Sequence, residues 1–413
     1  MLIKGVLSKR NFTQYQVEEL PSCLSLPSWL SSDPTPVRTP PGRWQAGLSG
    51  WQSGYVHHPS SPPSQGGDKG EVVKSNRIPL FCLIACLVIS VISLDQICFA
   101  GTREKDEVIY ALPIDAIPAI KDPEFVPANE AGLDDNEPVI GVTINGESRA
   151  YSVYLMNHHE IVNDKVGDDV FAVTWCPLAN LAVVYDRKID GREYTFGVSG
   201  KLLKNTLVMF DYETESLWPI AYGKSIDGKL SGKKADRVVN SQKMSWAAWK
   251  ALHPDTIVLS HRGSSTVGYD VYRNYHKSKQ TGIYPVKNID KRLGAKTEVI
   301  GIEVNGKYKA YPFSIFDNRR IVTDEFQGLN LLIYRNKETN SIKVYDRQID
   351  GHVIEFNSSK DFATDNITNT TWDLENGIGI KGSMKGKLLR PVSFITVYWF
   401  VWADYYHDTE IFY

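Results

Sequence analysis

Hydrophobic and polar positions alternate along most of the chain after residue 139. The segment VIGVTINGESRAY, which begins at Val139, alternates on both sides of Asn145-Gly146. This dipeptide between alternating segments is the strongest short signal for a β-hairpin. The segments FAVTW and LLIYR are apolar, β-branched and aromatic, so we predict that they are central strands. LAVVYDRKIDGREYTFGV predicts another hairpin, with Asp190-Gly191 at its turn.

The same pattern occurs twice. Ala150 corresponds to Ala310 and Asp164 to Asp324, each pair separated by 160 positions. Two W-x-x-W motifs close the two copies, and their spacing suits one face of a short helix. We therefore predict an α+β fold dominated by β structure. It consists of two tandem homologous repeats, each with a short helix, packed as a pseudo-twofold body.

This pattern sets the expected organisation of the chain. Residues 139–260 form the first repeat and residues 294–413 the second. The segment 261–293, rich in Gly, Tyr, Lys and Ser, is a long connection. Residues 101–138 contain frequent prolines and predict an extended lead-in.

The N-terminal region differs in composition from the rest of the chain. Residues 1–71 are rich in Pro, Ser and Gly without a hydrophobic period, which is typical of a disordered leader or of an extension that is not part of the natural protein. Residues 72–100 have a basic start, an apolar run from Ile78 to Leu94 and a small Ala100, the layout of a secretory signal. We expect export to the periplasm or the cell exterior. A membrane anchor is the alternative, and an uncleaved signal is then the only expected membrane contact.

Composition excludes some functions. The chain is 42% hydrophobic and 23% charged with a net charge of −2, which argues against a nucleic-acid partner and against a polybasic membrane-surface protein. Of the five cysteines, only Cys176 lies beyond residue 100, so the processed chain forms no internal disulfide. A mature chain of this size can fold on its hydrophobic core alone.

Several motifs occur together in one order: HEIVND at 159–164, VTWCPL at 173–178, VYDR at 184–187, FGVSGKL at 196–202 and ETESLW at 213–218. Over residues 111–413 the chain resembles domain-of-unknown-function family 3179, a bacterial and archaeal group often predicted to be exported. The resemblance implies no established activity. Many members look like CPLC at the cysteine motif, whereas this chain has Ala179 as the last residue, which departs from a two-thiol redox centre.

Chemistry-bearing residues are confined to the first copy. Features that both copies share are attributed to folding, whereas features of one copy are candidates for function. The differences are His158, His159 and Glu160 against Asn318, Arg319 and Arg320, and Trp175-Cys176-Pro177 against Arg335-Asn336-Lys337.

These residues allow three interpretations. Cys176 and His159 could form a thiolate–imidazole pair for nucleophilic catalysis, with Glu160 as the orienting carboxylate. His158, His159 and Cys176 could instead bind copper or zinc, with His253 or Glu160 completing the shell. In the third interpretation, Cys176 is a small buried hydrophobe and His159 a hydrogen-bonded structural histidine.

The leading functional hypothesis is an extracytoplasmic, enzyme-like protein with one His/Cys centre, acting on an unidentified small molecule. It predicts that His159 and Cys176 lie close together and line a pocket. A non-enzymatic binding module predicts a groove of exposed Trp and Tyr residues. A structural envelope protein predicts that both residues are buried without a cavity.

Overall fold

The computed structural model describes residues 107–413 except 239–240, 262 and 359–362. The predicted leader and signal segment therefore lie outside the described residues. The described part is dominated by β-strands, as predicted, and its helices are short: α2 (Val153–Met156), α3 (Trp246–Leu252), α4 (Arg273–Lys277), α5 (Trp399–Tyr405) and the 3-10 helix η2 (Phe313–Phe316). Within these ranges, no helix is both long and apolar enough to span a membrane.

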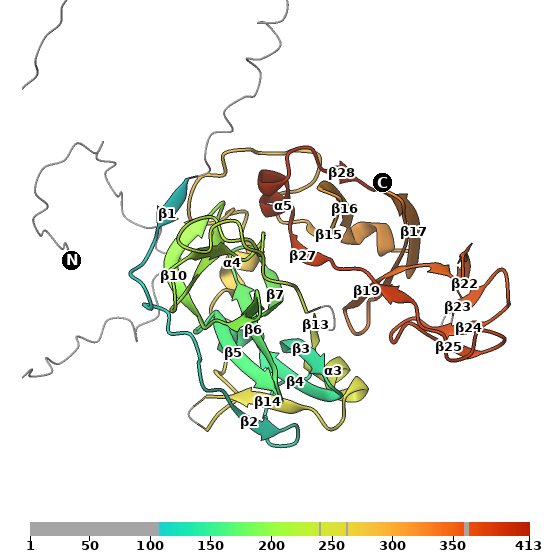
Figure 1. Ribbon diagram of the computed structural model, residues 1–413, viewed down its shortest axis with the longest axis horizontal. Coiled ribbons are helices and arrows are strands. Elements are labelled where there is room, and N and C mark those ends of the chain that lie inside the picture. The colour runs from blue at the N-terminus through green and yellow to red at the C-terminus, as the bar shows by residue number, and fades with distance from the viewer. Residues whose placement is uncertain (1–106, 239–240, 262, 359–362) are drawn as a thin grey trace, which may run out of the picture. The chain divides into compact units, whose positions relative to one another are not determined.

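Four sheets form the first half of the described chain, three of them with three or more strands and one the two-stranded β8-β9 pair (Figure 1). The largest has the order β13-β3-β4-β14-β2, with bounds Ser241–Ser245, Pro138–Ile144, Glu147–Ser152, Ile257–Ser260 and Glu124–Pro127. β3 and β4 pair as the predicted hairpin. Asn145 and Gly146 have φ of 52° and 80° at its turn, the positive values that a tight two-residue hairpin requires.

The second sheet carries the cysteine motif. It has the order β5 (Ile161–Val166), β6 (Asp169–Cys176) and β7 (Leu181–Asp186), so FAVTW is central as predicted. The third sheet has the order β1-β10-β11-β12, with bounds Val108–Tyr110, Phe196–Leu203, Thr206–Asp211 and Leu217–Pro219.

The predicted hairpin around Asp190-Gly191 forms, but it is shorter than predicted. Only β8 (Lys188–Ile189) and β9 (Arg192–Glu193) pair across this turn. β7 pairs with β6, whereas β10 pairs with β1 and β11. The chain changes sheets here, and the buried Arg187 guanidinium joins the two parts by donating to the main-chain carbonyls of Phe171 on β6 and of Tyr194 after the turn.

The second half contains four sheets. Its sheets have the orders β27-β15-β16-β28, β17-β18-β19-β26, β20-β21 and β22-β23-β24-β25. In chain order from β15, the bounds are Glu298–Val304, Lys307–Pro312, Ile321–Phe326, Leu329–Asn336, Ser341–Asp346, Gln348–Ile349, His352–Val353, Phe356–Ser358, Ala363–Asp365, Thr371–Asp373, Ile378–Lys381, Arg390–Pro391, Ile395–Tyr398 and Glu410–Ile411.

Corresponding elements of the halves make matching contacts. The order β27-β15-β16-β28 parallels β13-β3-β4-β14. Trp249 Nε1 donates to Thr256 Oγ1 at 2.9 Å, and Trp402 Nε1 donates to Thr409 Oγ1 at 2.8 Å. Each W-x-x-W motif therefore lies on a short helix, as predicted, and is tied to the strand that follows it.

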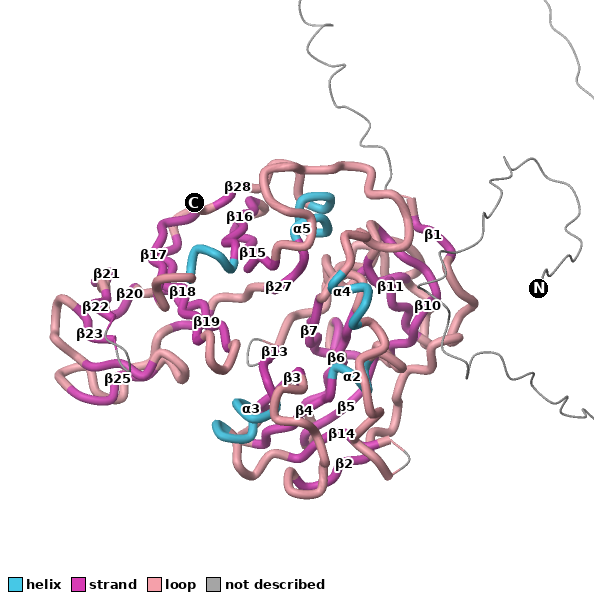
Figure 2. The backbone as a smooth tube through the Cα atoms, turned by 180° about the vertical axis from the view of Figure 1, so that it is seen from behind, coloured by secondary structure: helices cyan, strands magenta, loops and turns pink. Residues whose placement is uncertain are grey.

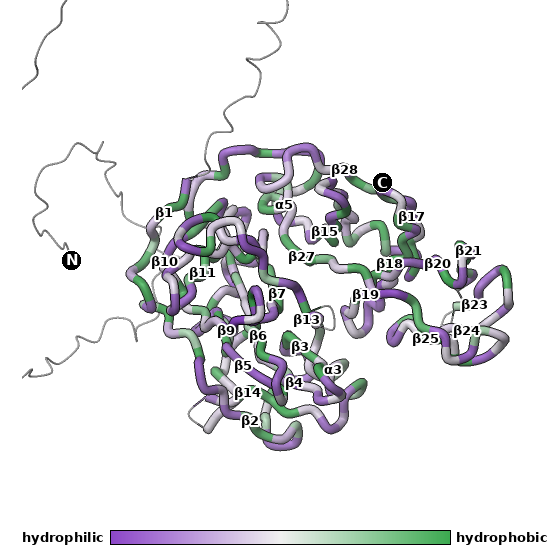
Figure 3. The backbone as a smooth tube through the Cα atoms, in the orientation of Figure 1, coloured by the Kyte–Doolittle hydropathy of each residue, from purple (hydrophilic) through white to green (hydrophobic). Residues whose placement is uncertain are grey.

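The two halves share one hydrophobic core. Ala179 and Val208 of the first half belong to the same buried cluster as Val397 and Trp399 of the second. In Figure 3, hydrophobic and hydrophilic stretches alternate along the chain, as expected for strands with one buried face. The seven tryptophans of the described part are all buried, so none contributes to an exposed aromatic groove.

Candidate functional site

Glu160 has a left-handed backbone conformation, which it shares with twelve other described non-glycine residues. The chain leaves α2, turns, and reaches Glu160 immediately before β5. Glu160 has φ of 57°, and Ile161 N donates to His159 O at 2.6 Å across it, which closes a three-residue turn. Such left-handed conformations cost non-glycine residues about 1–3 kcal/mol and cluster at functional sites.

The carboxyl group of Glu160 is unusual. Glu160 is only 8% exposed, and burial raises the pKa of its carboxyl group from 4.5 to about 8. Burial is the one cause of this rise, and no hydrogen bond from a described group lowers the pKa in opposition. Because burial disfavours the charged form, Glu160 is mainly a neutral carboxylic acid at pH 7.

Cys176 lies beside Glu160 at the end of β6. Trp175 N donates to Glu160 O at 2.8 Å, which joins the two segments. Cys176 is 1% exposed, and its Sγ lies 3.9 Å from Asn205 O. Burial, followed by the charge of Glu160, raises the pKa of the thiol to about 12, although the main-chain N–H groups of Leu207, Ala179 and Leu178 favour the thiolate. The resting group is therefore a thiol, not a reactive thiolate.

The connecting segment covers this pair. Tyr275, on α4, donates from its hydroxyl to Leu178 O at 2.7 Å and accepts from Gly282 N at 2.9 Å. Burial raises the pKa of Tyr272, and the charges of Glu160 and Cys176 raise it further, so this ring lies close to both groups. Figure 2 shows α4 beside the end of the β5-β6-β7 sheet.

Tyr272 and Tyr275 are the residues of this site that sequence reasoning missed. The one signal in the sequence is the richness of 261–293 in tyrosine, which is equally typical of a long connection. Nothing in the sequence spacing shows that this connection returns to the cysteine, because the contact joins positions about a hundred residues apart.

His159 has different partners. It is 8% exposed, its Nδ1 lies 2.8 Å from Pro118 O, and its ring packs against His261 with centroids 4.7 Å apart. A carbonyl can only accept, so Nδ1 carries the proton of this hydrogen bond. The described interactions of Cys176 are with Glu160, Asn205, tyrosines such as Tyr272, and main-chain groups, and none is with His159, so the described contacts do not include the expected thiolate–imidazole pair.

The residues predicted as metal ligands are not gathered into a metal site. Within the described ranges, no group of three or more His, Cys, Asp or Glu residues could hold a metal ion, so His158, His159 and Cys176 do not form one. Burial lowers the pKa of His158. His253 lies at the end of α3, where its Nδ1 is 3.0 Å from Ser148 Oγ and its ring packs on Trp249. The copper or zinc hypothesis therefore has no ligand set in the described structure.

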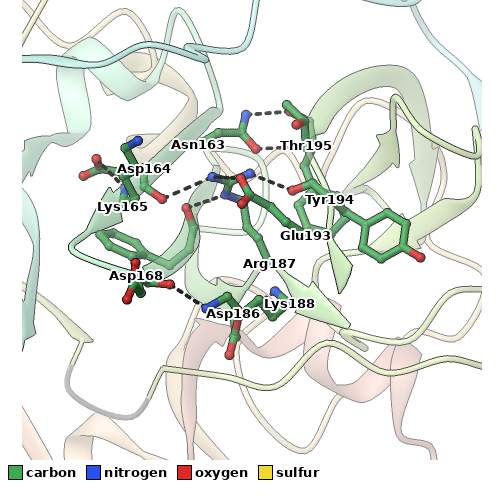
Figure 4. Close-up of polar contacts among 12 residues, drawn as sticks. Asn163, Asp164, Lys165, Asp168, Asp186, Arg187, Lys188, Glu193, Tyr194 and Thr195 are labelled. Atoms are coloured by element: carbon green, nitrogen blue, oxygen red, sulfur yellow. Dashed lines mark hydrogen bonds and ion pairs between the residues drawn. The ribbon is translucent and has the colours of Figure 1, made fainter. Parts of the chain in front are cut away.

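The neighbouring motif residues stabilise the scaffold (Figure 4). Arg187 is 5% exposed, donates to the carbonyls of Phe171 and Tyr194, and pairs with Glu193 at 3.0 Å. The side chain of Asn163 exchanges two 2.8 Å hydrogen bonds with the main chain of Phe196. These contacts satisfy buried main-chain groups where the chain changes sheets, so they account for the VYDR motif and the end of HEIVND without invoking chemistry.

The fold and this centre define a β-dominated protein with a buried acid and thiol in its first half. The family described as "Protein of unknown function (DUF3179)" matches residues 114–409, and the chain belongs to this family. Searches of curated proteins and of solved structures found no match.

Proposed function

We propose that this protein is an extracytoplasmic, enzyme-like protein whose centre is the Glu160–Cys176 pair. The observation that carries this proposal is the Glu160 carboxyl, which is buried on a left-handed residue with no hydrogen bond that lowers its pKa. A purely structural role would be served at lower cost by an apolar or amide side chain, because burying an acid is unfavourable. Strongly perturbed carboxyl groups are concentrated at functional sites.

The chemistry that fits is proton transfer beside a thiol. A carboxyl group with a pKa of about 8 exchanges its proton near neutral pH, as a general acid or base must. When Glu160 is ionised, its carboxylate can accept the proton of the Cys176 thiol while the sulfur adds to a carbonyl carbon of the substrate. The S–H bond and the C=O π bond break, and the π electron pair moves to the carbonyl oxygen. The main-chain N–H groups of Leu178, Ala179 and Leu207 favour negative charge on that sulfur. In this proposal His159 has a structural role, because its hydrogen bond to Pro118 O holds the lead-in against the turn before Glu160.

We also propose that the two halves are tandem repeats in a pseudo-twofold body and that only the first keeps the centre. The matching sheet orders and the matching Trp–Thr hydrogen bonds support this. Arg335 N donates to Arg320 O at 2.8 Å, as Trp175 N does to Glu160 O. Arg320 is nevertheless not among the described residues with positive φ, so the left-handed turn belongs to the first half alone.

The proposed location rests on the signal-like segment 72–100. N-terminal sequencing of the protein from an envelope fraction is expected to begin at Gly101. A mature protein that begins at Met1 would reject this cleavage, and an uncleaved chain in the membrane fraction would favour the anchor.

The aromatic-surface alternative is less well supported. The described tryptophans are buried, and the large exposed aromatic residues are the tyrosines Tyr110, Tyr269 and Tyr413. An aromatic ligand surface would therefore have to be built from tyrosines alone.

The test is labelling of Cys176 in the native protein with a chloroacetamide between pH 6 and pH 9. We expect slow labelling whose rate rises with an apparent pKa near 8 and falls about tenfold in Glu160→Gln, because general-base assistance is typically worth at least this much. Glu130→Gln, an exposed carboxyl, is the matched control. Labelling that occurs only after denaturation, or that is equal in both variants, would remove the support for a catalytic pair.

A further inference from the structure

The turn between β10 and β11 lies against Cys176. It consists of Lys204 and Asn205, whose φ values of 49° and 59° are both positive, as a tight two-residue hairpin requires. The carbonyl oxygen of Asn205 accepts the thiol of Cys176, with Sγ and O 3.9 Å apart. The main-chain N–H of Leu207, two residues later, favours negative charge on the same sulfur. This turn therefore presents one acceptor and one donor to the thiol.

The side chain of Asn205 binds the connecting segment. Its Oδ1 accepts from Ile283 N at 2.9 Å and from Tyr284 N at 3.0 Å, and its Nδ2 donates to Tyr284 O at 3.1 Å. Asn205 is only 3% exposed, so these hydrogen bonds are shielded from water. They join positions 78 and 79 residues apart, so they fix a tertiary contact and not the local turn. One residue thus contacts the thiol with its main chain and the connecting segment with its side chain.

Gly282 shows how closely the two segments fit. A Cβ atom added at Gly282 would lie 2.1 Å from both Cγ and Oδ1 of Asn205, far inside van der Waals contact. The N–H of Gly282 donates to the Tyr275 hydroxyl at 2.9 Å, which joins the same point to α4. The cover over the acid–thiol pair is therefore attached at two places, by the Tyr275 hydroxyl and by the Asn205 amide.

We propose that Asn205 is a positioning residue for the acid–thiol centre, because its carbonyl directs the Cys176 S–H group while its amide holds the cover closed. The inference rests on the proposed function, in which Cys176 is the nucleophile. A substrate reaches the sulfur only when the Asn205 side chain releases Ile283 and Tyr284. An apolar side chain of the same size could not replace it, since the buried main-chain groups of these two residues would lose their partners.

Chloroacetamide labelling of the full-length protein tests this role, followed by mass spectrometry of the peptide that contains Cys176. Asn205→Gly keeps the left-handed turn and its carbonyl but removes the amide. We expect roughly tenfold faster labelling, because the hydrogen bonds that hold the cover are lost. The midpoint of the pH profile should also fall below 8, since burial is what raises the pKa of Glu160 and a loosened cover admits water to it.

Gly282→Ala tests the same contact from the other side. In the wild type the added methyl group collides with Asn205 and should accelerate labelling. In an Asn205→Gly background this collision is absent, so Gly282→Ala should add much less, and such non-additivity identifies a direct contact. Lys204→Gly is the matched control. It changes the other left-handed residue of the turn, whose ammonium donates to Asp404 O, and should label close to the wild-type rate.

Three outcomes would overturn the proposal. One is equal labelling of Asn205→Gly and Lys204→Gly, and another is an effect of Gly282→Ala that is the same in both backgrounds. The third is labelling of Asn205→Gly with a midpoint near 9.0, the ordinary thiol value, which would indicate reaction through the unfolded chain. Failure of the proposed function is distinguishable. If Glu160→Gln labels at the wild-type rate while the coupling between Asn205 and Gly282 is found, the catalytic pair is rejected and the positioning of the thiol and its cover is not.

Discussion

At the scale of single residues, Glu160 is the residue on which the proposed function depends. It combines a left-handed backbone, a buried side chain and a carboxyl group whose pKa burial raises to about 8. The sequence pointed to Glu160 only as an orienting partner of a histidine and a cysteine. Neither its φ nor the burial of its carboxyl group could be predicted, because both depend on how the turn after α2 meets the end of β6.

The raised pKa makes stability depend on pH. In the unfolded chain, Glu160 ionises near 4.5, whereas in the folded protein it ionises near 8. Its contribution is therefore fully favourable below pH 4.5 and is lost as the pH rises through 8. Glu160→Gln removes this penalty. Urea unfolding should show that the free energy of unfolding of the variant, relative to the wild type, is roughly 4 kcal/mol higher at pH 9 than at pH 5.

The control for that comparison is Glu130→Gln, because this exposed carboxyl should shift stability little and equally at both pH values. A Glu160→Gln effect that does not change with pH would mean that the carboxyl has an ordinary pKa in the folded state.

At the scale of elements, the cover over the acid–thiol pair depends on α4. This five-residue helix is too short to be stable alone, so its position depends on tertiary contacts. The Tyr275 hydroxyl provides two of them, to Leu178 O and from Gly282 N. Period-two alternation predicted the strands and the Asn-Gly turns well. It could not predict α4, because a short helix within a polar connection has no hydrophobic period.

Removing the Tyr275 hydroxyl should loosen this cover. Tyr275→Phe keeps the ring but loses both hydrogen bonds, which are worth about 1–3 kcal/mol together. Alkylation of Cys176 in the native protein should therefore accelerate about tenfold, measured by mass spectrometry over time.

Tyr269→Phe is the matched control for this experiment, because Tyr269 is 69% exposed. If Tyr275→Phe and Tyr269→Phe label at the wild-type rate, α4 does not govern access to the thiol.

At the scale of the whole molecule, the halves are joined by a common core and by hydrogen bonds across it. Tyr398 N donates to Ala179 O at 3.1 Å, and the Thr206 and Tyr405 hydroxyls lie 2.5 Å apart. The repeated pattern in the sequence predicted the corresponding strands, but not which edges meet, because the seam joins side chains that differ between the two halves. The predicted length of the Asp190-Gly191 hairpin is wrong, because β7 and β10 pair in different sheets and only β8 and β9 pair across the turn.

The shared core predicts that the halves unfold together. Calorimetry of the full chain should show one cooperative transition for residues 107–413, since the cluster that contains Ala179 and Trp399 belongs to both halves. Two separate transitions, each matched by an isolated half, would show that the seam contributes little to stability.

The central claim is that Glu160 remains an uncharged acid beside Cys176 up to neutral pH. The most direct measurement is an infrared titration of the protonated-carboxyl band, taken as the difference between wild type and Glu160→Gln from pH 4 to pH 10. The structure predicts a carboxyl band that disappears with a midpoint near pH 8. A midpoint near the ordinary value of 4.5 would contradict the claim and leave the centre without its distinguishing group.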